Sequence, residues 1–153
     1  MIDTPIVTQH AEQPTAVIRL TIPRAEIQHA MGPAHEELRR VLVEQGVTPS
    51  GPWFSHHLRM DPATFDFEAG VPVQAPIVPA GRVVNSLLPA ARVARTTYRG
   101  GYEGLGAAWG EFETWLRDEG LRDAGNLWEV YAVGPESGPD PAQWRTEMYR
   151  PLA

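Results

Sequence analysis

The sequence predicts one α+β domain, residues 1–153, in which an antiparallel sheet carries two helices on one face. Two segments have the 3.6-residue apolar period of an amphipathic helix, and several shorter segments alternate apolar with polar residues as strands do. Each helical segment is flanked by strands that follow one another in the chain, which is typical of an α+β layout. A chain of 153 residues is long enough to bury one core of its own.

The first half is predicted to begin with a strand and a helix. Residues 15–22 alternate β-branched apolar side chains with polar ones. The helix is expected at 33–45, with Pro33 in its first turn and Gly46 just after its end. The segment before Pro33 would then be a separate turn or short helix. The apolar face of this helix carries Ala34, Leu38, Val41 and Leu42.

Two further strands, 53–60 and 65–73, complete the first half, with a turn at Asp61-Pro62 between them. The second half is predicted to contain a similar series. Its elements are strands at 82–88 and 91–98, a helix at 102–119, and strands at 126–133 and 144–151. The second helix would end at Gly120. It would bury Leu105, Trp109, Phe112, Trp115 and Leu116.

The two halves match when the chain is shifted by about 74 residues along itself. The aligned pairs include Gly32 with Gly106, Ala34 with Ala108, Leu42 with Leu116, and Gly46 with Gly120. With one residue of slippage, Trp53 meets Trp128. Amphipathic helices share apolar spacings in any case, so the glycines and tryptophans carry most of the weight. We therefore predict an internal repeat, with one copy at about 15–75 and the other at about 81–152.

The composition excludes several classes of function. The chain has no cysteine, which excludes disulfides and thiolate catalysis and fits a cytoplasmic location. All 13 basic residues are arginine, which excludes lysine Schiff-base and P-loop chemistry. The formal net charge of −6 argues against a nucleic-acid surface and mildly favours cationic ligands. No apolar run is long enough to span a membrane, and residues 1–13 lack the pattern of a secretion signal.

The strand at 126–133 contains one carboxylate, Glu129, among apolar and aromatic residues. A carboxylate removed from water costs several kcal/mol unless a positive or hydrogen-bonding group meets it. Since the strand has neither Arg nor His, the partner must come from elsewhere in the fold, from water or from a ligand. Strand alternation places Glu129 and Tyr131 on one face with Leu127 and Val133. Trp128, Val130 and Ala132 would occupy the other face, in the core under the helices.

Three stretches, taken in order, resemble a known family. They are Gly81-Arg82-Val83 running to Leu88-Pro89-Ala90-Ala91, Arg99-Gly100-Gly101-Tyr102 before the helix that ends in Trp115-Leu116, and Trp128-Glu129-Val130-Tyr131 followed by Arg150-Pro151-Leu152. Together they resemble the GyrI-like small-molecule-binding domain, which also serves as the effector-binding half of AraC-type and MerR-type multidrug regulators. The resemblance covers essentially residues 15–152.

The resemblance implies two βαββ units related by a pseudo-two-fold, with a ligand cleft between them. It also implies that Glu129 is the pocket glutamate that faces bound lipophilic cations. Because few residues precede the first predicted strand, a stand-alone domain without a DNA-binding helix-turn-helix is expected.

The repeat extends this candidate site to the first half. With Trp53 over Trp128, Phe54 and His56 take the places of Glu129 and Tyr131, so these four side chains would line the cleft. Tyr149, on the last predicted strand, is a further candidate ligand contact. No metal or cofactor is expected, because His56 and His57 point to opposite strand faces and no third ligand lies at a recognised spacing.

These features lead to three functional hypotheses. The first is binding of lipophilic, often cationic, aromatic small molecules in a cleft centred on Glu129. The second is a hydrolase that opens the strained cyclopropane rings of DNA-alkylating natural products, as some members of the GyrI-like family do. Glu129 would then activate water, with Tyr131 or His56 assisting. The third is a protein–protein inhibitor of the kind described for DNA gyrase, although the acidic residues here are dispersed.

Overall fold

A computed structural model describes residues 2–60 and 62–153 and confirms the α+β class. Within these residues the chain forms two α-helices and eight strands, all paired antiparallel where their partners are assigned. The chain divides into two compact units, which we name after their helices. Part of the turn expected at Asp61-Pro62 lies outside the described residues. None of the described helices combines the length and hydropathy that a membrane span requires.

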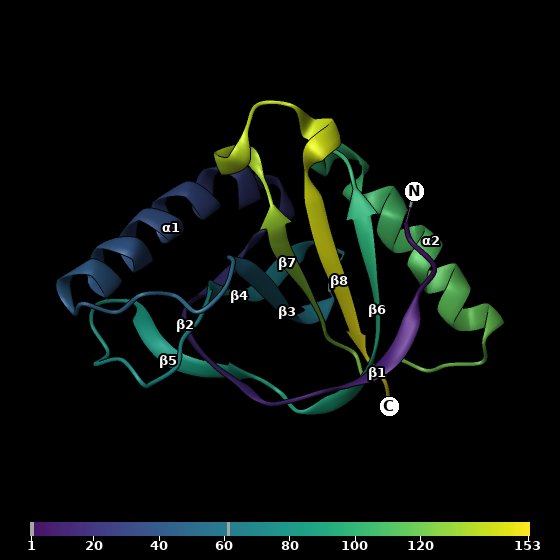
Figure 1. The fold of residues 1–153 in the computed structure, drawn as a ribbon, viewed down its shortest axis with the longest axis horizontal. Coiled ribbons are helices and arrows are strands. Elements are labelled where there is room, and N and C mark those ends of the chain that lie inside the picture. The colour runs from purple at the N-terminus through teal and green to yellow at the C-terminus, as the bar shows by residue number, and fades with distance from the viewer. Residues whose placement is uncertain (1, 61) are drawn as a thin grey trace. The chain divides into compact units, whose positions relative to one another are not determined.

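The α1 unit comprises Ala11–Ala90. Its strands lie in the order β3-β4-β2-β5, and α1 covers one face of them (Figure 1). Its elements are β2 (Gln13–Pro23), a 3₁₀ turn (Arg24–Glu26), α1 (Ile27–Glu44), β3 (Phe54–Met60), β4 (Thr64–Pro72) and β5 (Val83–Leu88).

The α2 unit comprises Met1–His10 and Ala91–Ala153. Its strands lie in the order β1-β6-β8-β7, and Figure 1 shows β8 running between β6 and β7. Its elements are β1 (Ile6–His10), β6 (Ala91–Arg99), a 3₁₀ turn (Tyr102–Gly104), α2 (Leu105–Asp118), β7 (Leu127–Val133) and β8 (Arg145–Pro151). Two short 3₁₀ turns, Pro135–Ser137 and Pro141–Gln143, lie in the loop between β7 and β8.

The two units share the same series of elements and the same order of strands. Each runs strand, helix, strand, strand, and each gains one more strand at the free edge of the first. Both helices also end in the same way. Gly46 and Gly120 have φ of 67° and 71°. Just after them, the N–H of Val47 donates to the carbonyl oxygen of Leu42 and the N–H of Leu121 to that of Leu116, which closes the last turn of each helix. Both predicted helix stops are confirmed, because only glycine adopts this left-handed conformation without strain.

Each helix buries the apolar face that its period predicts. Ala34, Leu38 and Leu42 of α1 pack against a sheet face that includes Ile18 and Ala69. On α2, Ala108, Phe112 and Leu116 pack against Ala94, Tyr98 and Met148. Burying a Leu or Phe side chain contributes about 1.5–3 kcal/mol, so these stripes supply much of the free energy that holds each helix to its sheet.

The predicted start of the first helix was wrong. α1 begins at Ile27, so Pro33 lies inside the helix rather than in its first turn. A proline there removes one backbone hydrogen bond and costs about 3 kcal/mol in an isolated helix. Ile27, Ala30 and Met31 extend the apolar face by nearly two turns and pack against the core, which offsets that cost.

Two strands differ from the sequence expectations. β1 was not predicted, because it is an edge strand whose side chains are largely exposed and show no alternation; Ile6 is 56% exposed. It pairs with β6 across more than eighty residues of chain. The strand that was expected to open the second half, now β5, instead pairs with β2 of the α1 unit through residues such as Val83 opposite Ile18.

His57 lies in the apolar interior of the α1 unit. Its ring stacks on Phe67 at 5.1 Å between ring centroids and meets Phe65 edge-on at 5.2 Å. Burial, reinforced by the nearby charges of His56 and Arg24, lowers the pKa of His57 from 6.5 to about 4. The imidazole is therefore neutral in the folded protein at pH 7 and stays neutral well below the pH at which the unfolded chain takes up its proton.

This difference predicts a loss of stability on acidification. Between pH 6.5 and pH 4 the unfolded state binds a proton at His57 that the folded state does not bind, so the free energy of unfolding falls as the pH falls. Between pH 7 and pH 5 we expect His57 to account for about 2 kcal/mol of that decrease. Urea unfolding of wild type and His57→Phe at both pH values measures it. A decrease of equal size in the two proteins would contradict the assignment.

Candidate functional site

Glu129 lies on the face of β7 that α2 covers. Its ladder partner on β8 is Met148, a fully buried member of the core beneath α2. The prediction that Glu129 and Tyr131 lie on the face away from the helices was therefore wrong. The reason is visible in the sequence: Leu127 and Trp128 are adjacent, apolar and both buried, so alternation gives two faces without showing which one the helix covers.

Two neutral donors meet the Glu129 carboxylate. The indole Nε1–H of Trp109, from α2, donates to Oε2 at 2.6 Å. The hydroxyl of Tyr131 donates to Oε1 at 3.0 Å. Glu129 is only 8% exposed, and hydrogen bonds to a charged group are about twice as strong as neutral ones. The partner that the sequence required from elsewhere in the fold is thus in part Trp109, which the helical period assigns to core packing alone.

Further aromatic rings continue from this carboxylate toward solvent. Tyr102, from the 3₁₀ turn before α2, meets Tyr131 edge-on at 5.7 Å between ring centroids and Trp144 at 5.2 Å. Tyr102 is 38% exposed, so this end of the row is accessible. We name Tyr102, Trp109, Glu129 and Tyr131 the Glu129 cluster. The sequence places Tyr102 at a helix start, and no local pattern could have shown that its ring turns back over β7.

A small pocket lies beside this row of rings, in the loop between β7 and β8. Its volume is about 90 Å³. Its lining residues are Val133, Ser137, Gly138, Pro139, Asp140, Gln143 and Trp144. The indole of Trp144 is held in place by a hydrogen bond of 3.1 Å to the carbonyl oxygen of Gly138. Trp144, which contacts Tyr102, is the aromatic residue among those that line the pocket.

Tyr149 lies on the opposite face of the same sheet. It pairs with Trp128 in the ladder, and the two rings stack at 5.3 Å with 17° between their planes. The guanidinium of Arg95 lies 5.2 Å from the centre of the Tyr149 ring. Burial and the neighbouring Glu147 carboxylate raise the pKa of Tyr149. Tyr149 is thus separate from the Glu129 cluster, and its role as a ligand contact stays a prediction.

Phe54 and His56 project from the face of the α1-unit sheet that is opposite α1. His56 pairs with Glu68, whose neighbour Phe67 points to the helix side. Both side chains are buried.

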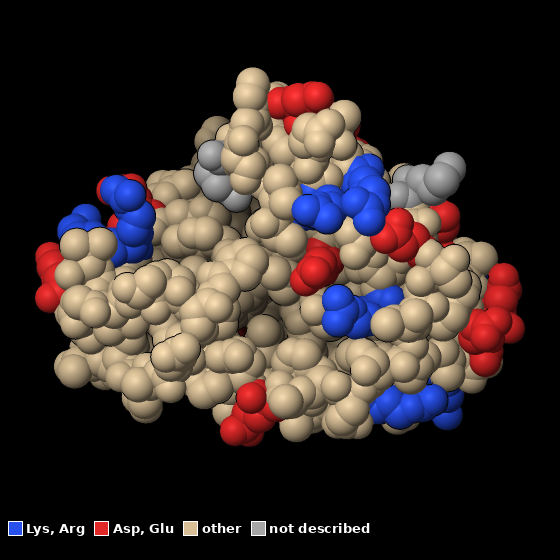
Figure 2. All heavy atoms as spheres, in the orientation of Figure 1, with Lys and Arg blue, Asp and Glu red and all other residues tan. Residues whose placement is uncertain are grey.

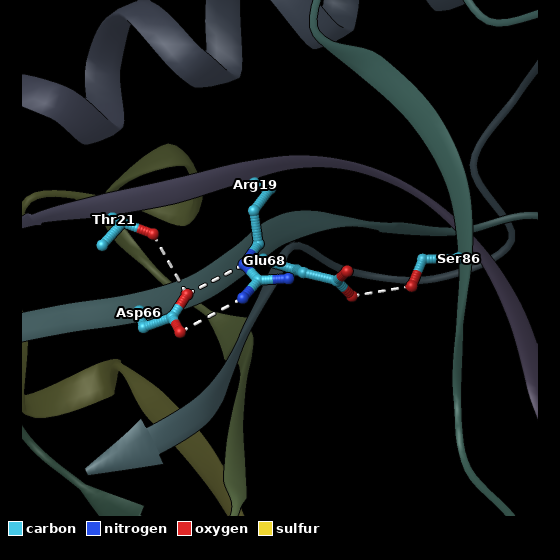
Figure 3. Close-up of polar contacts among 5 residues, drawn as sticks. All are labelled: Arg19, Thr21, Asp66, Glu68 and Ser86. Atoms are coloured by element: carbon cyan, nitrogen blue, oxygen red, sulfur yellow. Dashed lines mark hydrogen bonds and ion pairs between the residues drawn. The ribbon is translucent and has the colours of Figure 1, made fainter.

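The same sheet face carries the polar network in Figure 3. Arg19 donates two hydrogen bonds to Asp66, at 2.8 and 3.1 Å, and the hydroxyl of Thr21 donates a third at 3.2 Å. The hydroxyl of Ser86 donates to Glu68 at 2.7 Å. The network ties β2, β4 and β5 together, which gives it a structural function.

The alignment at a shift of 74 residues sets Ser55 against Glu129, and the ladders show that both lie on the helix-covered face of their strands. Ser55 pairs with Ala69 on β4, a buried residue beneath α1, just as Glu129 pairs with Met148 beneath α2. The alignment at a shift of 74 residues, with no extra residue inserted, therefore also holds on these strands. It aligns Ser55 with Glu129 and His57 with Tyr131. The predicted equivalence of Phe54 with Glu129 and of His56 with Tyr131 was wrong by one residue, and one residue exchanges the two faces of a strand.

On the face of the molecule shown in Figure 2, the charged side chains do not gather into a large patch of one sign. Arginine and carboxylate side chains alternate there in small groups among uncharged atoms. In residues 2–60 and 62–153, no three His, Cys, Asp or Glu side chains are grouped as a metal site requires. The Glu129 cluster combines one carboxylate with several aromatic rings. Such a combination can hold a flat cation or orient a water molecule.

Solved structures share this fold. The C-terminal domain of EcmrR matches with a TM-score of 0.86 and 18% identity over 100% of this chain and 98% of that one. In a complex of EcmrR with DNA, the TM-score is 0.84 and the identity 19% over 97% of this chain, which spans only 57% of that protein. None of the curated proteins compared matches the sequence.

Two more distant structures also cover nearly the whole chain. SAV2435, solved bound to tetraphenylphosphonium, has a TM-score of 0.68 and 10% identity over 99% of this chain and 94% of its own. A hydrolase from Listeria innocua has a TM-score of 0.64 and 13% identity over 97% and 91%. At these identities the structures show the fold alone. The sequence itself matches the family model of the GyrI-like small molecule binding domain over residues 3–153. With that match over almost its full length, the chain belongs to the GyrI-like small-molecule-binding domain family.

Proposed function

We propose that the protein binds lipophilic, often cationic, aromatic small molecules at the Glu129 cluster. The observation that carries the proposal is a carboxylate, 8% exposed, whose two oxygens are held by Trp109 and Tyr131 beside the accessible ring of Tyr102. Aromatic faces attract cations, and a carboxylate in a poorly hydrated place adds an opposite charge that water screens little.

The comparisons support this choice of ligand. The family is one of small-molecule-binding domains, and SAV2435 is described as bound to tetraphenylphosphonium, a cation surrounded by aryl groups. Ring stacking and one charge place few demands on ligand shape, so broad specificity would follow. Phe54, His56 and Tyr149 remain proposed contacts, and each projects from the sheet face opposite the helix of its unit.

The first test compares a cation with a neutral molecule of similar shape. Methyltriphenylphosphonium should bind wild type more tightly than triphenylphosphine oxide does. Glu129→Gln should weaken the phosphonium by about 30-fold, or about 2 kcal/mol, and leave the neutral compound nearly unchanged, since only the charge is removed. Isothermal titration calorimetry measures both affinities.

The matched control is Glu111→Gln, which removes an exposed carboxylate from α2 of the same unit. It should leave phosphonium binding close to the wild-type value. Equal phosphonium affinity in wild type and Glu129→Gln would reject the role of the charge.

The second test concerns how Glu129 is held. Trp109→Phe keeps a ring on α2 but removes the N–H that donates to Oε2. A double-mutant cycle with Glu129→Leu, which removes the acceptor, read by urea unfolding, should give a coupling free energy of about 1.5–3 kcal/mol, the usual range for a hydrogen bond to a charged group. Trp115→Phe, on the same helix, serves as the control and should show coupling near zero. A Trp109 coupling as small as that of the control would mean that the 2.6 Å contact contributes nothing to stability.

A second candidate function is hydrolysis of strained cyclopropane compounds. The observation that favours it is the 3.0 Å hydrogen bond between Tyr131 and Glu129, which places a hydroxyl beside a carboxylate that could activate water. Glu129 would take a proton from water as the water oxygen bonds to a ring carbon. The carbon–carbon bond would break, its electron pair would pass to a conjugated carbonyl, and the oxyanion formed there would gain that proton back. The fold is shared with a hydrolase from Listeria innocua.

Incubation with a cyclopropane-fused dienone, followed by mass spectrometry, tests this function. We expect the product to gain the mass of one water at a rate above the uncatalysed one. Tyr131→Phe, which removes only the hydroxyl, should lower that rate by about a thousandfold, because general acid–base catalysis usually contributes a factor of that order. A wild-type rate equal to that in buffer would leave binding as the function of the site.

A further inference from the structure

The α1 unit contains counterparts of three residues of the Glu129 cluster, namely Glu129, Tyr131 and Tyr102. The ladders put Ser55 and Glu129 on the helix-covered faces of β3 and β7, and His57 and Tyr131 each follow two residues later on the same strand. Arg24 opens the 3₁₀ turn before α1, as Tyr102 opens the turn before α2. The backbone framework is repeated, but an acid and two tyrosines are replaced by a hydroxyl, an imidazole and a guanidinium.

Aromatic rings surround the basic groups here too. The guanidinium carbon of Arg24 lies 4.4 Å from the centre of the Phe65 ring. His57 meets the same Phe65 ring edge-on at 5.2 Å and stacks on Phe67 at 5.1 Å. Arg24 and Phe65 are half-exposed, so the outer side of this cluster can be reached from solvent.

One polar atom in the cluster has no partner in the part of the chain that the structure describes. Nδ1 of His57 is buried and makes no hydrogen bond with residues 2–60 or 62–153, and the residue is only 5% exposed. Buried polar atoms are nearly always satisfied, and an unsatisfied one marks a place where a ligand could supply the missing bond. The depressed pKa of His57 keeps the ring neutral, so one of its nitrogens is an acceptor at pH 7.

We propose that Arg24, His57 and Phe65 form a second ligand site, in the α1 unit, that takes phenolic compounds. The phenol hydroxyl donates to Nδ1 of His57, and its ring lies against Phe65. The phenol oxygen gains negative charge as it donates, and the Arg24 cation stabilises that charge. With the ring proton on Nε2, Nδ1 of His57 is the acceptor, and an aromatic carboxylate, which is ionised at pH 7, has no proton to donate to it.

The test compares a phenol with its methyl ether. In wild type at pH 7, 4-hydroxyacetophenone should bind about tenfold more tightly than 4-methoxyacetophenone, as one additional hydrogen bond allows, and more tightly than 4-acetylbenzoate. His57→Phe keeps the ring but removes the acceptor, so the ratio of the two affinities should fall to about one. Arg24→Gln should weaken the phenol more than the ether. Titration calorimetry or ligand-observed NMR gives the affinities.

Arg39→Gln, an exposed arginine of α1, is the matched control and should leave the phenol preference unchanged. Circular dichroism checks the fold of each variant. If His57→Phe does not fold, His57→Leu, which also lacks an acceptor, takes its place. Equal binding of phenol and ether by wild type would overturn the proposal, as would a preference that survives in His57→Phe. The phosphonium titrations are independent of this result, so a protein that binds the phenol but not the cation would support the second site and reject the Glu129 proposal alone.

Discussion

The hydrogen bonds that Trp109 and Tyr131 donate to Glu129 join helix α2 to strand β7 in the α2 unit. A carboxylate beneath a helix is costly unless the fold brings donors to it, and an isolated charge there would disfavour folding by several kcal/mol. The β7–β8 ladder sets the side of the sheet on which Glu129 lies, because it pairs with buried Met148. The apolar stripe of α2 then brings Trp109 over the strand. The site therefore depends on sheet register and helix packing together, and a change in either would leave the carboxylate unsatisfied.

The sequence allowed the order of elements to be predicted, because strong local signals mark it. Apolar periodicity located both helices, and Gly46 and Gly120 located their ends. The start of α1 was misplaced because tertiary packing of Ile27 and Met31 outweighed the local effect of Pro33. β1 was missed because an exposed edge strand has no alternation to detect.

The candidate site was predicted less completely. Glu129 and Tyr131 do lie together, since residues two apart on a strand share a face. Tyr102 and Trp109 could not be joined to them from sequence, because their contacts depend on how the helix lies on the sheet. The error with Phe54 and His56 has the same origin: matching tryptophans suggested a slippage of one residue, and only the ladders show that Ser55 and His57 are the counterparts.

The pairing of β1 has a consequence for how the chain folds as it is made. The α1 unit is formed by one continuous stretch, Ala11–Ala90, and can fold once that stretch has left the ribosome. β1 is synthesised before that stretch but pairs with β6, so it must wait unpaired until residues 91–99 emerge. During that interval its apolar side chains, Ile6 and Val7, are available to any other unpaired strand edge. Because β6 is synthesised later, β1 is among the last strands to pair, and until then it can pair wrongly with a strand of a neighbouring chain.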